Sequence, residues 1–267
     1  MKQKIRIGVL VSGSGTNMDA IIKACADEKV NGEVIFVGSD NPAAKGLEKA
    51  AQKNIPTFVV DYADIIRNFK NDPENHFFPD DFDFEDIKIK QSLLSNETDT
   101  QKVSAFIETR AIAEAALLEQ MKPYPFDLLV LAGFMRNLTP YFIDRVNTIP
   151  GKPRIMNIHP ALLPAFPGVD GYGDTFRYGC KVGGCTVHFI DYGEDSGPII
   201  GQRCFPIEAT DTIDDVKQKG LALEYQLYPQ CIQLFAQNRL TVVKMTYTDN
   251  HGKISQRNVV KIAQIDT

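Results

Sequence analysis

Short apolar segments alternate with helix-like segments through the first 160 residues, and this alternation constrains the fold more than any other feature of the chain. The segments typical of buried strands are rich in Val, Ile and Leu, and they cover residues 5–11, 34–38, 57–60, 128–131 and 154–158. Helix-like segments lie between them, including a long amphipathic one at 102–121. Strands separated by helices form βαβ units, so we expect an α/β fold with a mostly parallel, twisted sheet flanked by helices.

The second half of the chain has a different pattern. Two strand-like segments, 183–190 and 198–207, are joined by a short loop, and the helix predicted at 212–237 is interrupted near Pro229. Two further strand-like segments flank a turn and predict a hairpin at about 239–264. We therefore expect one domain over residues 1–267, with antiparallel strands in its C-terminal part.

Residues 63–105 fit this pattern poorly. The stretch from Asp72 to Asp86 mixes acidic and aromatic residues at a place where a βα connection normally takes about 2–6 residues. We favour a surface excursion whose phenylalanines pack locally. A flap or a subunit contact is the alternative.

Charge, hydropathy and cysteine use argue against several classes of protein. The 267 residues carry a net charge of −5, whereas a nucleic-acid binder normally shows a basic surface. The longest apolar run, 128–135, is much shorter than the ~20 residues of a membrane-spanning helix, and the N-terminus lacks the apolar core of a signal peptide. Five cysteines, an odd number, favour free thiols in the cytoplasm, and Cys180 and Cys185 are too far apart for a CxxC zinc motif. We expect no metal, nucleic acid or membrane as a partner.

A glycine-rich loop follows the first predicted strand, and its position suits a phosphate. Residues 12–17 read Ser-Gly-Ser-Gly-Thr-Asn, so Gly15, Thr16 and Asn17 would offer backbone N–H groups and a hydroxyl at a helix N-terminus. Met18 stands where the dinucleotide pattern requires its third glycine, and the Walker pattern is absent. A monophosphate is favoured over a dinucleotide or ATP, and a glycine turn without a ligand is an equal alternative.

Three polar residues in the second half suit chemistry at a carbonyl group. Asn157 and His159 are two positions apart on a predicted strand, so both should lie on one side of it, at the edge where open α/β sheets bind ligands. An amide can stabilise an oxyanion, and an imidazole can move a proton. Asp195, in a glycine-flanked loop, would raise the pKa of the imidazole if it lay nearby. Taken alone, His159 and Asp195 are better explained as structural residues, and His188 is read as a packed strand histidine.

Taken in order, these motifs resemble those of the phosphoribosylglycinamide formyltransferase family. The likeness is carried by the loop at 12–17 and by segments 131–136, 157–164, 187–189 and 195–198, and it covers nearly the whole chain except an insertion at about 63–105. The resemblance implies a Rossmann-like formyltransferase fold, with a nucleotide-binding half at about 1–125 and a folate and catalytic half at about 126–238. It also implies transfer of a formyl group from 10-formyltetrahydrofolate to the amino group of glycinamide ribonucleotide in purine biosynthesis, without a metal.

The resemblance further implies roles for individual residues. It implies catalysis by Asn157, His159 and Asp195. For the ribonucleotide and its phosphate it implies Gly15, Thr16, Asn17, Leu221, Ala222, Leu223 and Glu224. For the folate it implies Arg110, Met135, Arg136, Asn137, Leu138, Asn157, Asp191, Tyr192, Gly193, Glu194 and Asp195. The run Val169-Asp170-Gly171-Tyr172-Gly173-Asp174 differs from the histidines or alanine-rich helix start that the family usually carries.

Three alternatives share part of this pattern. Formyltetrahydrofolate deformylase has the same catalytic trio together with an N-terminal regulatory domain, and methionyl-tRNA formyltransferase has an appended RNA-binding domain; we expect neither domain here. A catalytically silent nucleotide-binding protein would have no chemical reason to keep Asn157, His159 and Asp195. We therefore favour the transferase, with a homodimer as one candidate assembly.

Overall fold

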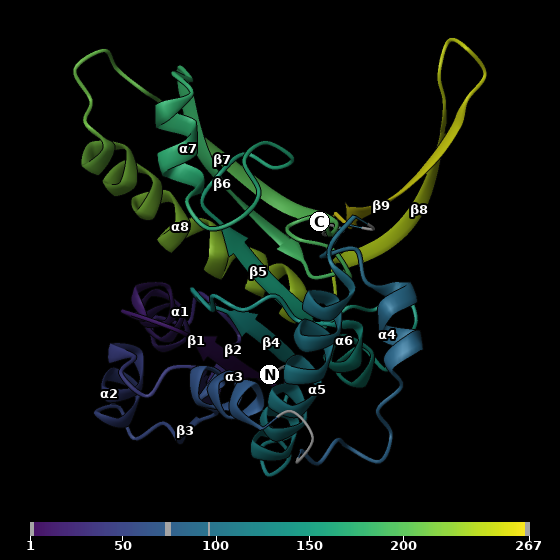
Figure 1. The fold of residues 1–267 in the computed structure, drawn as a ribbon. Coiled ribbons are helices and arrows are strands. Elements are labelled where there is room, and N and C mark those ends of the chain that lie inside the picture. Colours follow the sequence, from purple (N-terminus) through teal and green to yellow (C-terminus); the bar gives the residue numbers. More distant parts are fainter. Residues whose placement is uncertain (1–2, 73–75, 96, 265–267) are drawn as a thin grey trace.

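A seven-stranded sheet organises the fold, in the order β3-β2-β1-β4-β5-β6-β7 (Figure 1). The structure is a computed structural model and describes residues 3–72, 76–95 and 97–264, so Met1 and Lys2 of the predicted N-terminus lie outside it. The strands of this sheet are β1 (Ile5–Val11), β2 (Gly32–Ser39), β3 (Thr57–Val59), β4 (Leu128–Leu131), β5 (Ile155–His159), β6 (Val182–Phe189) and β7 (Ile199–Pro206).

Strand pairing confirms the predicted fold class. The first five strands pair in parallel, and β6 and β7 add to the sheet in antiparallel pairs. The chain moves outward from β1 to β3 on one side and from β4 to β7 on the other, so the strand order reverses between β1 and β4. Open α/β sheets bind ligands beyond the carboxyl ends of the strands at such a switch point.

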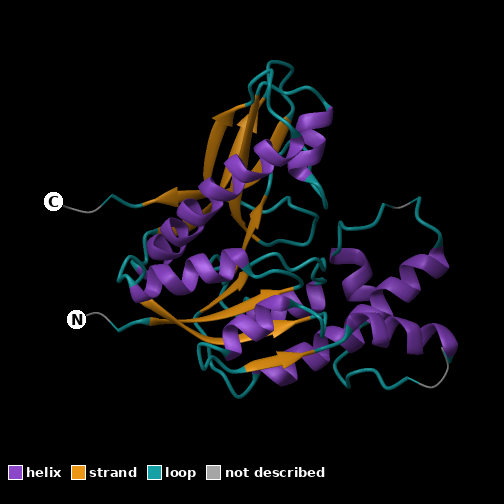
Figure 2. Cartoon of the chain, turned by 90° about the vertical axis from the view of Figure 1, so that its left-hand side faces the viewer, coloured by secondary structure: helices purple, strands orange, loops and turns teal. Residues whose placement is uncertain are grey.

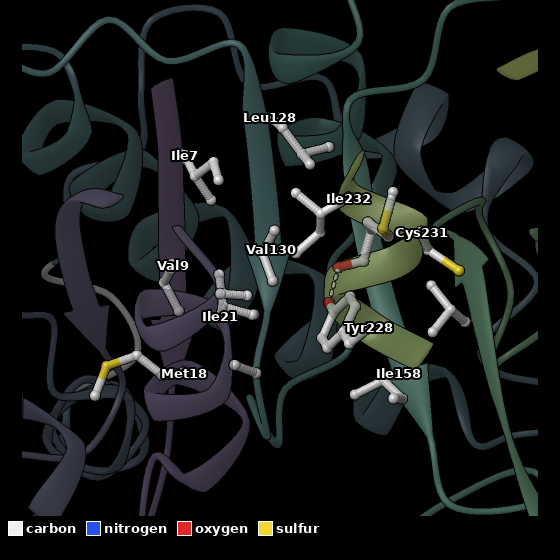
Figure 3. Packing of buried hydrophobic residues seen from close by; sticks show 14 of the residues in the cluster. Ile7, Val9, Met18, Ile21, Leu128, Val130, Ile158, Tyr228, Cys231 and Ile232 are labelled. Atoms are coloured by element: carbon white, nitrogen blue, oxygen red, sulfur yellow. Dashed lines mark hydrogen bonds between the residues drawn. The ribbon is translucent and has the colours of Figure 1, made fainter. Parts of the chain in front are cut away.

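Helices cover both faces of the sheet (Figure 2). Consecutive residues of a strand point to opposite faces of the sheet. Because helices cover both faces, every residue of β4 is buried, which explains why this strand is apolar throughout. Val130 packs with Ile21 and Ile232 on one face (Figure 3), whereas Leu129 packs with Leu117 and Phe142 on the other. The helices are α1 (Thr16–Ala26), α2 (Lys45–Ala51), α3 (Tyr62–Asn71), α4 (Phe84–Lys90), α5 (Thr100–Met121), α6 (Pro140–Val146), α7 (Gly171–Arg177) and α8 (Ile213–Ala236).

The predicted interruption near Pro229 was wrong, because α8 continues through this residue. A proline inside a helix lacks the N–H that bonds to the carbonyl four residues earlier, and this costs about 3 kcal/mol. On either side of it, Tyr228 and Cys231 are buried against the sheet. The Tyr228 hydroxyl also donates to the backbone carbonyl of Met156 at 2.7 Å (Figure 3), and the carbonyl of Leu131 shares this donor at 3.0 Å. We attribute the continuity of α8 to this packing, which outweighs the local preference for a break.

Residues 63–105, predicted to be an insertion, include most of α3 and all of α4, and their phenylalanines pack locally as favoured from the sequence. Phe78 and Phe82 stack with their ring centroids 5.0 Å apart, and Phe82 and Phe84 join a cluster with Ile87. Phe77 is the exception, since it is 93% exposed. Residues 73–75 and 96 of this segment lie outside the described residues.

The predicted hairpin is also present, as β8 (Leu240–Thr248) paired antiparallel with β9 (Ile254–Ile262). It extends from the body of the molecule as a curved ribbon (Figure 1). All five cysteines are free. Within residues 3–72, 76–95 and 97–264, no helix has the length and apolar character that crossing a membrane requires.

Candidate active site

A cavity of about 340 Å³ lies at the carboxyl ends of the central strands. Its walls come from the loops after β4 and β5, from the start of α1 and from α8. The loops after β1 and β4 flank the point where the strand order reverses, so the cavity occupies the position where this sheet topology binds ligands.

The three predicted catalytic residues meet in this cavity. The His159 Nδ1 atom lies 3.0 Å from Asp195 Oδ2, and His159 is 3% exposed. The backbone N–H of Gly168 donates to the same carboxylate oxygen at 2.9 Å. Asp195 adopts φ 48°, a left-handed conformation that is uncommon outside glycine. Asn157 lines the same cavity, so the three residues lie together at one site.

The surroundings of His159 favour the imidazolium. Its second ring nitrogen, Nε2, lies 2.7 Å from the backbone carbonyl oxygen of Phe166, so both nitrogens face oxygen acceptors. Burial alone would lower the pKa of His159, but the Asp195 carboxylate and the Phe166 carbonyl outweigh it and raise that pKa. Burial opposes ionisation of Asp195, yet the hydrogen bond from His159 holds the pKa of this carboxyl far below its usual value.

His188 belongs to the same cluster, which sequence reasoning missed. It is fully buried, as expected for a packed strand histidine, but its Nε2 lies 3.3 Å from Asn157 Nδ2 and 3.6 Å from Asp195 Oδ1. Its Nδ1 lies 2.9 Å from the Phe189 carbonyl oxygen. If Nδ1 carries the proton, Nε2 accepts from the Asn157 amide. The contact arises because Asn157 of β5 and His188 of β6 are direct partners in the antiparallel pair. The sequence alone does not determine which residues of the two strands are paired.

Two residues predicted for the ribonucleotide, one from α1 and one from α8, line the cavity and contact each other. Asn17 Nδ2 donates to Glu224 Oε2 at 2.6 Å, and both residues are buried. Gly15 precedes α1 at φ 68°, and a Cβ there would lie 2.8 Å from the Gly46 Cα. The N-terminus of α1 has no side-chain cap, so its first N–H groups suit an anion. Leu221 also lines the cavity, whereas Thr16 faces a separate groove between α1 and α8.

The predicted folate segments line the other side of the cavity and hold each other in place. The backbone N–H of Met135 donates to Ser12 Oγ at 2.8 Å, and Arg136 Nε donates to Asp40 Oδ2 at 2.5 Å. Asn137 Nδ2 donates to Glu194 Oε1 at 3.2 Å, which connects the two loops. The predicted folate residues in the lining are Met135, Arg136, Asn137, Leu138, Asn157, Asp191, Gly193, Glu194 and Asp195.

Other predicted residues lie outside the lining. Arg110 is buried between the rings of Tyr62 and Phe106, with its guanidinium carbon 5.3 and 5.0 Å from their centroids. Tyr192 instead donates its hydroxyl to Asp144 Oδ1. The residues placed outside the lining are Gly15, Thr16, Arg110, Tyr192, Ala222 and Leu223.

The end of the segment predicted as an insertion reaches the cavity, in agreement with its expected position near the folate entrance. Leu93 lines it, and the backbone N–H of Ser92 donates to the Tyr192 carbonyl oxygen at 2.9 Å. Residues 92–93 therefore contact the loop that carries Asp195.

Comparison with known proteins agrees with this geometry. A family model described as formyl transferase matches residues 5–232. A phosphoribosylglycinamide formyltransferase from Bacillus subtilis is 32% identical over 228 residues, covering 85% of this chain and 93% of that protein. A trifunctional purine biosynthetic protein from Homo sapiens is 30% identical over 88% of this chain, which spans only 19% of that protein.

A solved structure extends the likeness to the whole fold. Glycinamide ribonucleotide transformylase 1 from Symbiobacterium toebii superimposes with a TM-score of 0.69 at 33% identity, covering 99% of this chain and 96% of that chain. With the family model matching most of the sequence, the chain belongs to the formyl transferase family, among the phosphoribosylglycinamide formyltransferases.

Proposed function

We propose that this formyltransferase transfers the formyl group of 10-formyltetrahydrofolate to the amino group of glycinamide ribonucleotide in purine biosynthesis. The observation that carries the proposal is the meeting of Asn157, His159 and Asp195 in one cavity. The names of the most similar relatives support the same reaction.

The reaction begins when the neutral amine of the ribonucleotide attacks the formyl carbon. A new C–N bond forms, and the formyl oxygen becomes an oxyanion. The Asn157 amide nitrogen has two hydrogens, of which one faces His188, so the other is free to donate to this oxyanion. The His159 imidazolium adds a fixed positive charge nearby. Removing one such donor typically costs about 2.7–4 kcal/mol of transition-state stabilisation.

The intermediate collapses when the bond from the formyl carbon to folate N10 breaks. The amine must lose a proton and N10 must gain one. Asp195 is the proposed relay, directly or through a water, because its carboxylate lines the cavity together with Asn157 and His159. Positioning of the two substrates supplies a further ~7–11 kcal/mol, and the scheme needs no metal.

Each substrate has its own set of proposed contacts. The N–H groups of Gly15, Thr16 and Asn17 bind the phosphate, and Glu224 accepts hydrogen bonds from hydroxyl groups of the ribonucleotide. Leu221, Ala222 and Leu223 form the adjoining helix surface. The folate is bound by segments 135–138 and 191–195, and by Arg110 after a movement of its side chain out of the aromatic stack.

The test is an assay of 10-formyltetrahydrofolate consumption with and without glycinamide ribonucleotide. We expect consumption only when both substrates are present, with formylated ribonucleotide as the product, and loss of turnover in His159→Ala. Consumption at the same rate without the ribonucleotide would favour a deformylase instead.

Location and assembly follow as further proposals. We propose a cytoplasmic enzyme, because five free thiols suit a reducing compartment. A homodimer remains a prediction. Sedimentation analysis of the full chain measures the mass of the assembly and so tests it.

A further inference from the structure

The carboxylate of Glu224 is held from two sides. The Tyr172 hydroxyl donates to Oε1 at 2.7 Å, and Asn17 Nδ2 donates to Oε2 at 2.6 Å. Glu224 is 4% exposed and Tyr172 is 5% exposed, and all three residues line the cavity. The contact with Tyr172 comes from α7, in the run 169–174 where this sequence departs from the family's usual pattern.

The backbone of α8 makes room for this phenol ring. Gly220 lies one helical turn before Glu224, and a Cβ at Gly220 would lie 2.1 Å from the Tyr172 Cζ atom. The ring therefore rests directly on the helix backbone, and Phe205 and Val216 complete an apolar cluster around it. Burial and the nearby Glu224 carboxylate raise the pKa of Tyr172, so its hydroxyl remains a donor at physiological pH.

We propose that Tyr172 is a positioning residue for the ribonucleotide, with its hydroxyl fixing the Glu224 carboxylate in the orientation that accepts the substrate's hydroxyl groups. This inference rests on the proposed function. A carboxylate has about four acceptor positions, and Tyr172 and Asn17 occupy two of them. The two that remain match the two hydroxyl groups of a ribose.

The same hydrogen bond favours the ionised form of Glu224. Burial raises the pKa of Glu224, while the donors Asn17 and Tyr172 and the charge of His159 oppose this rise. The polar and titratable groups near the carboxylate are Asn17 of α1, His159 of β5, Tyr172 of α7, Cys185 of β6 and Tyr228 of α8, and Lys217 of α8 lines the same cavity. Without the Tyr172 hydroxyl, Asn17 would remain as the side-chain donor to the Glu224 carboxylate. The pKa of Glu224 would then rise further.

The test is the variant Tyr172→Phe, which keeps the ring on Gly220 and removes only the hydroxyl. We expect the KM for glycinamide ribonucleotide to rise about 10- to 100-fold, since a hydrogen bond to a charged group is lost, while kcat and the KM for the folate stay near their wild-type values. The rise in KM should be largest at low pH and shrink as the pH increases and Glu224 ionises. Tyr247→Phe, on the distant hairpin, is the matched control and should leave all three parameters unchanged.

A second measurement does not depend on turnover. In protein labelled with ¹³C-glutamate, the Glu224 carboxyl signal is identified by its absence in Glu224→Gln, and its titration midpoint should move to higher pH in Tyr172→Phe. A wild-type enzyme that does not transfer formyl to the ribonucleotide would refute the proposed function together with this inference. A working wild type with an unchanged ribonucleotide KM or an unchanged Glu224 midpoint in Tyr172→Phe would overturn the inference alone.

Discussion

Glu114 should make the stability of this enzyme fall as the pH rises toward neutrality. This residue of α5 is fully buried and accepts hydrogen bonds from the Thr139 backbone N–H at 2.8 Å and the Thr139 hydroxyl at 2.5 Å. Burial raises the pKa of Glu114 to about 7 from an ordinary value of 4.5. Thr139 directly follows the folate segment 135–138, so the same carboxyl group anchors one wall of the cavity.

The size of the effect follows from linkage. Because the folded-state pKa is raised, the folded chain holds the Glu114 proton more tightly than the unfolded chain does. The resulting stabilisation is fully present below about pH 4.5 and is lost as the pH rises through about 7. A rise from 4.5 to about 7, at 1.36 kcal/mol for each pKa unit, corresponds to roughly 3 kcal/mol. Glu114→Gln keeps an acceptor for the Thr139 N–H and removes the titration.

The assay is urea unfolding of the wild type and of Glu114→Gln between pH 5 and pH 8. The stability of the variant relative to the wild type should increase across this range by about 2.5 kcal/mol, since part of the stabilisation by Glu114 is already lost at pH 5. Glu119→Gln, an exposed carboxylate on the same helix, is the control for loss of a charge alone. A relative stability of Glu114→Gln that is equal at both ends of the range, or lower at pH 8, would refute the reasoning.

Three further perturbations test the site. Asp195→Asn should lower kcat by roughly 10²–10⁴-fold while the circular dichroism spectrum stays unchanged, because the proton relay and the charge facing His159 are removed together; near-normal turnover would exclude the assigned role. Thr16→Glu should weaken ribonucleotide binding by roughly 10-fold in calorimetric titrations. The side chain of residue 16 faces the groove between α1 and α8, but the substitution adds a negative charge at the start of α1, whose N–H groups are proposed to bind the phosphate; equal affinity would contradict a phosphate at this helix N-terminus. Gly220→Ala should lower the urea midpoint and raise the KM for the ribonucleotide, because the added methyl group displaces the Tyr172 ring; a variant equal to the wild type in both would contradict the close contact.

The local pattern of apolar and polar residues was sufficient to predict the sheet and part of the candidate site. Apolar runs such as 5–11 and 128–131 could be read as buried strands because both faces of a parallel strand are covered. The two-residue spacing of Asn157 and His159 placed both in the same cavity, and the fold brought Asp195 to them. The roles of these residues came from the resemblance of the motifs to a known family. The spacing of the residues alone does not indicate them.

The remaining contacts depend on tertiary packing that the sequence does not encode locally. His188 reaches Asn157 through the register of an antiparallel pair, and Leu93 reaches the cavity through the path of the insertion. Tyr172 reaches Glu224, 52 residues later in the sequence, because Gly220 of α8 has no side chain to block the ring. The continuity of α8 through Pro229 likewise reflects packing against the sheet and opposes the local preference for a break.

We infer different tasks for two of the proposed catalytic residues, His159 and Asp195. Both nitrogens of His159 already face protein oxygens, Asp195 Oδ2 and the Phe166 carbonyl, so releasing a proton would break one of these contacts. We infer that His159 acts as a fixed positive charge and that the mobile proton passes elsewhere. Asp195 Oδ2 is occupied by His159 and Gly168, whereas Oδ1 has a longer contact of 3.6 Å with His188. Oδ1 is therefore the oxygen that can accept the proton of the amine. Because the pKa of Asp195 is low, we infer that the carboxylate does not retain this proton and passes it to the leaving nitrogen.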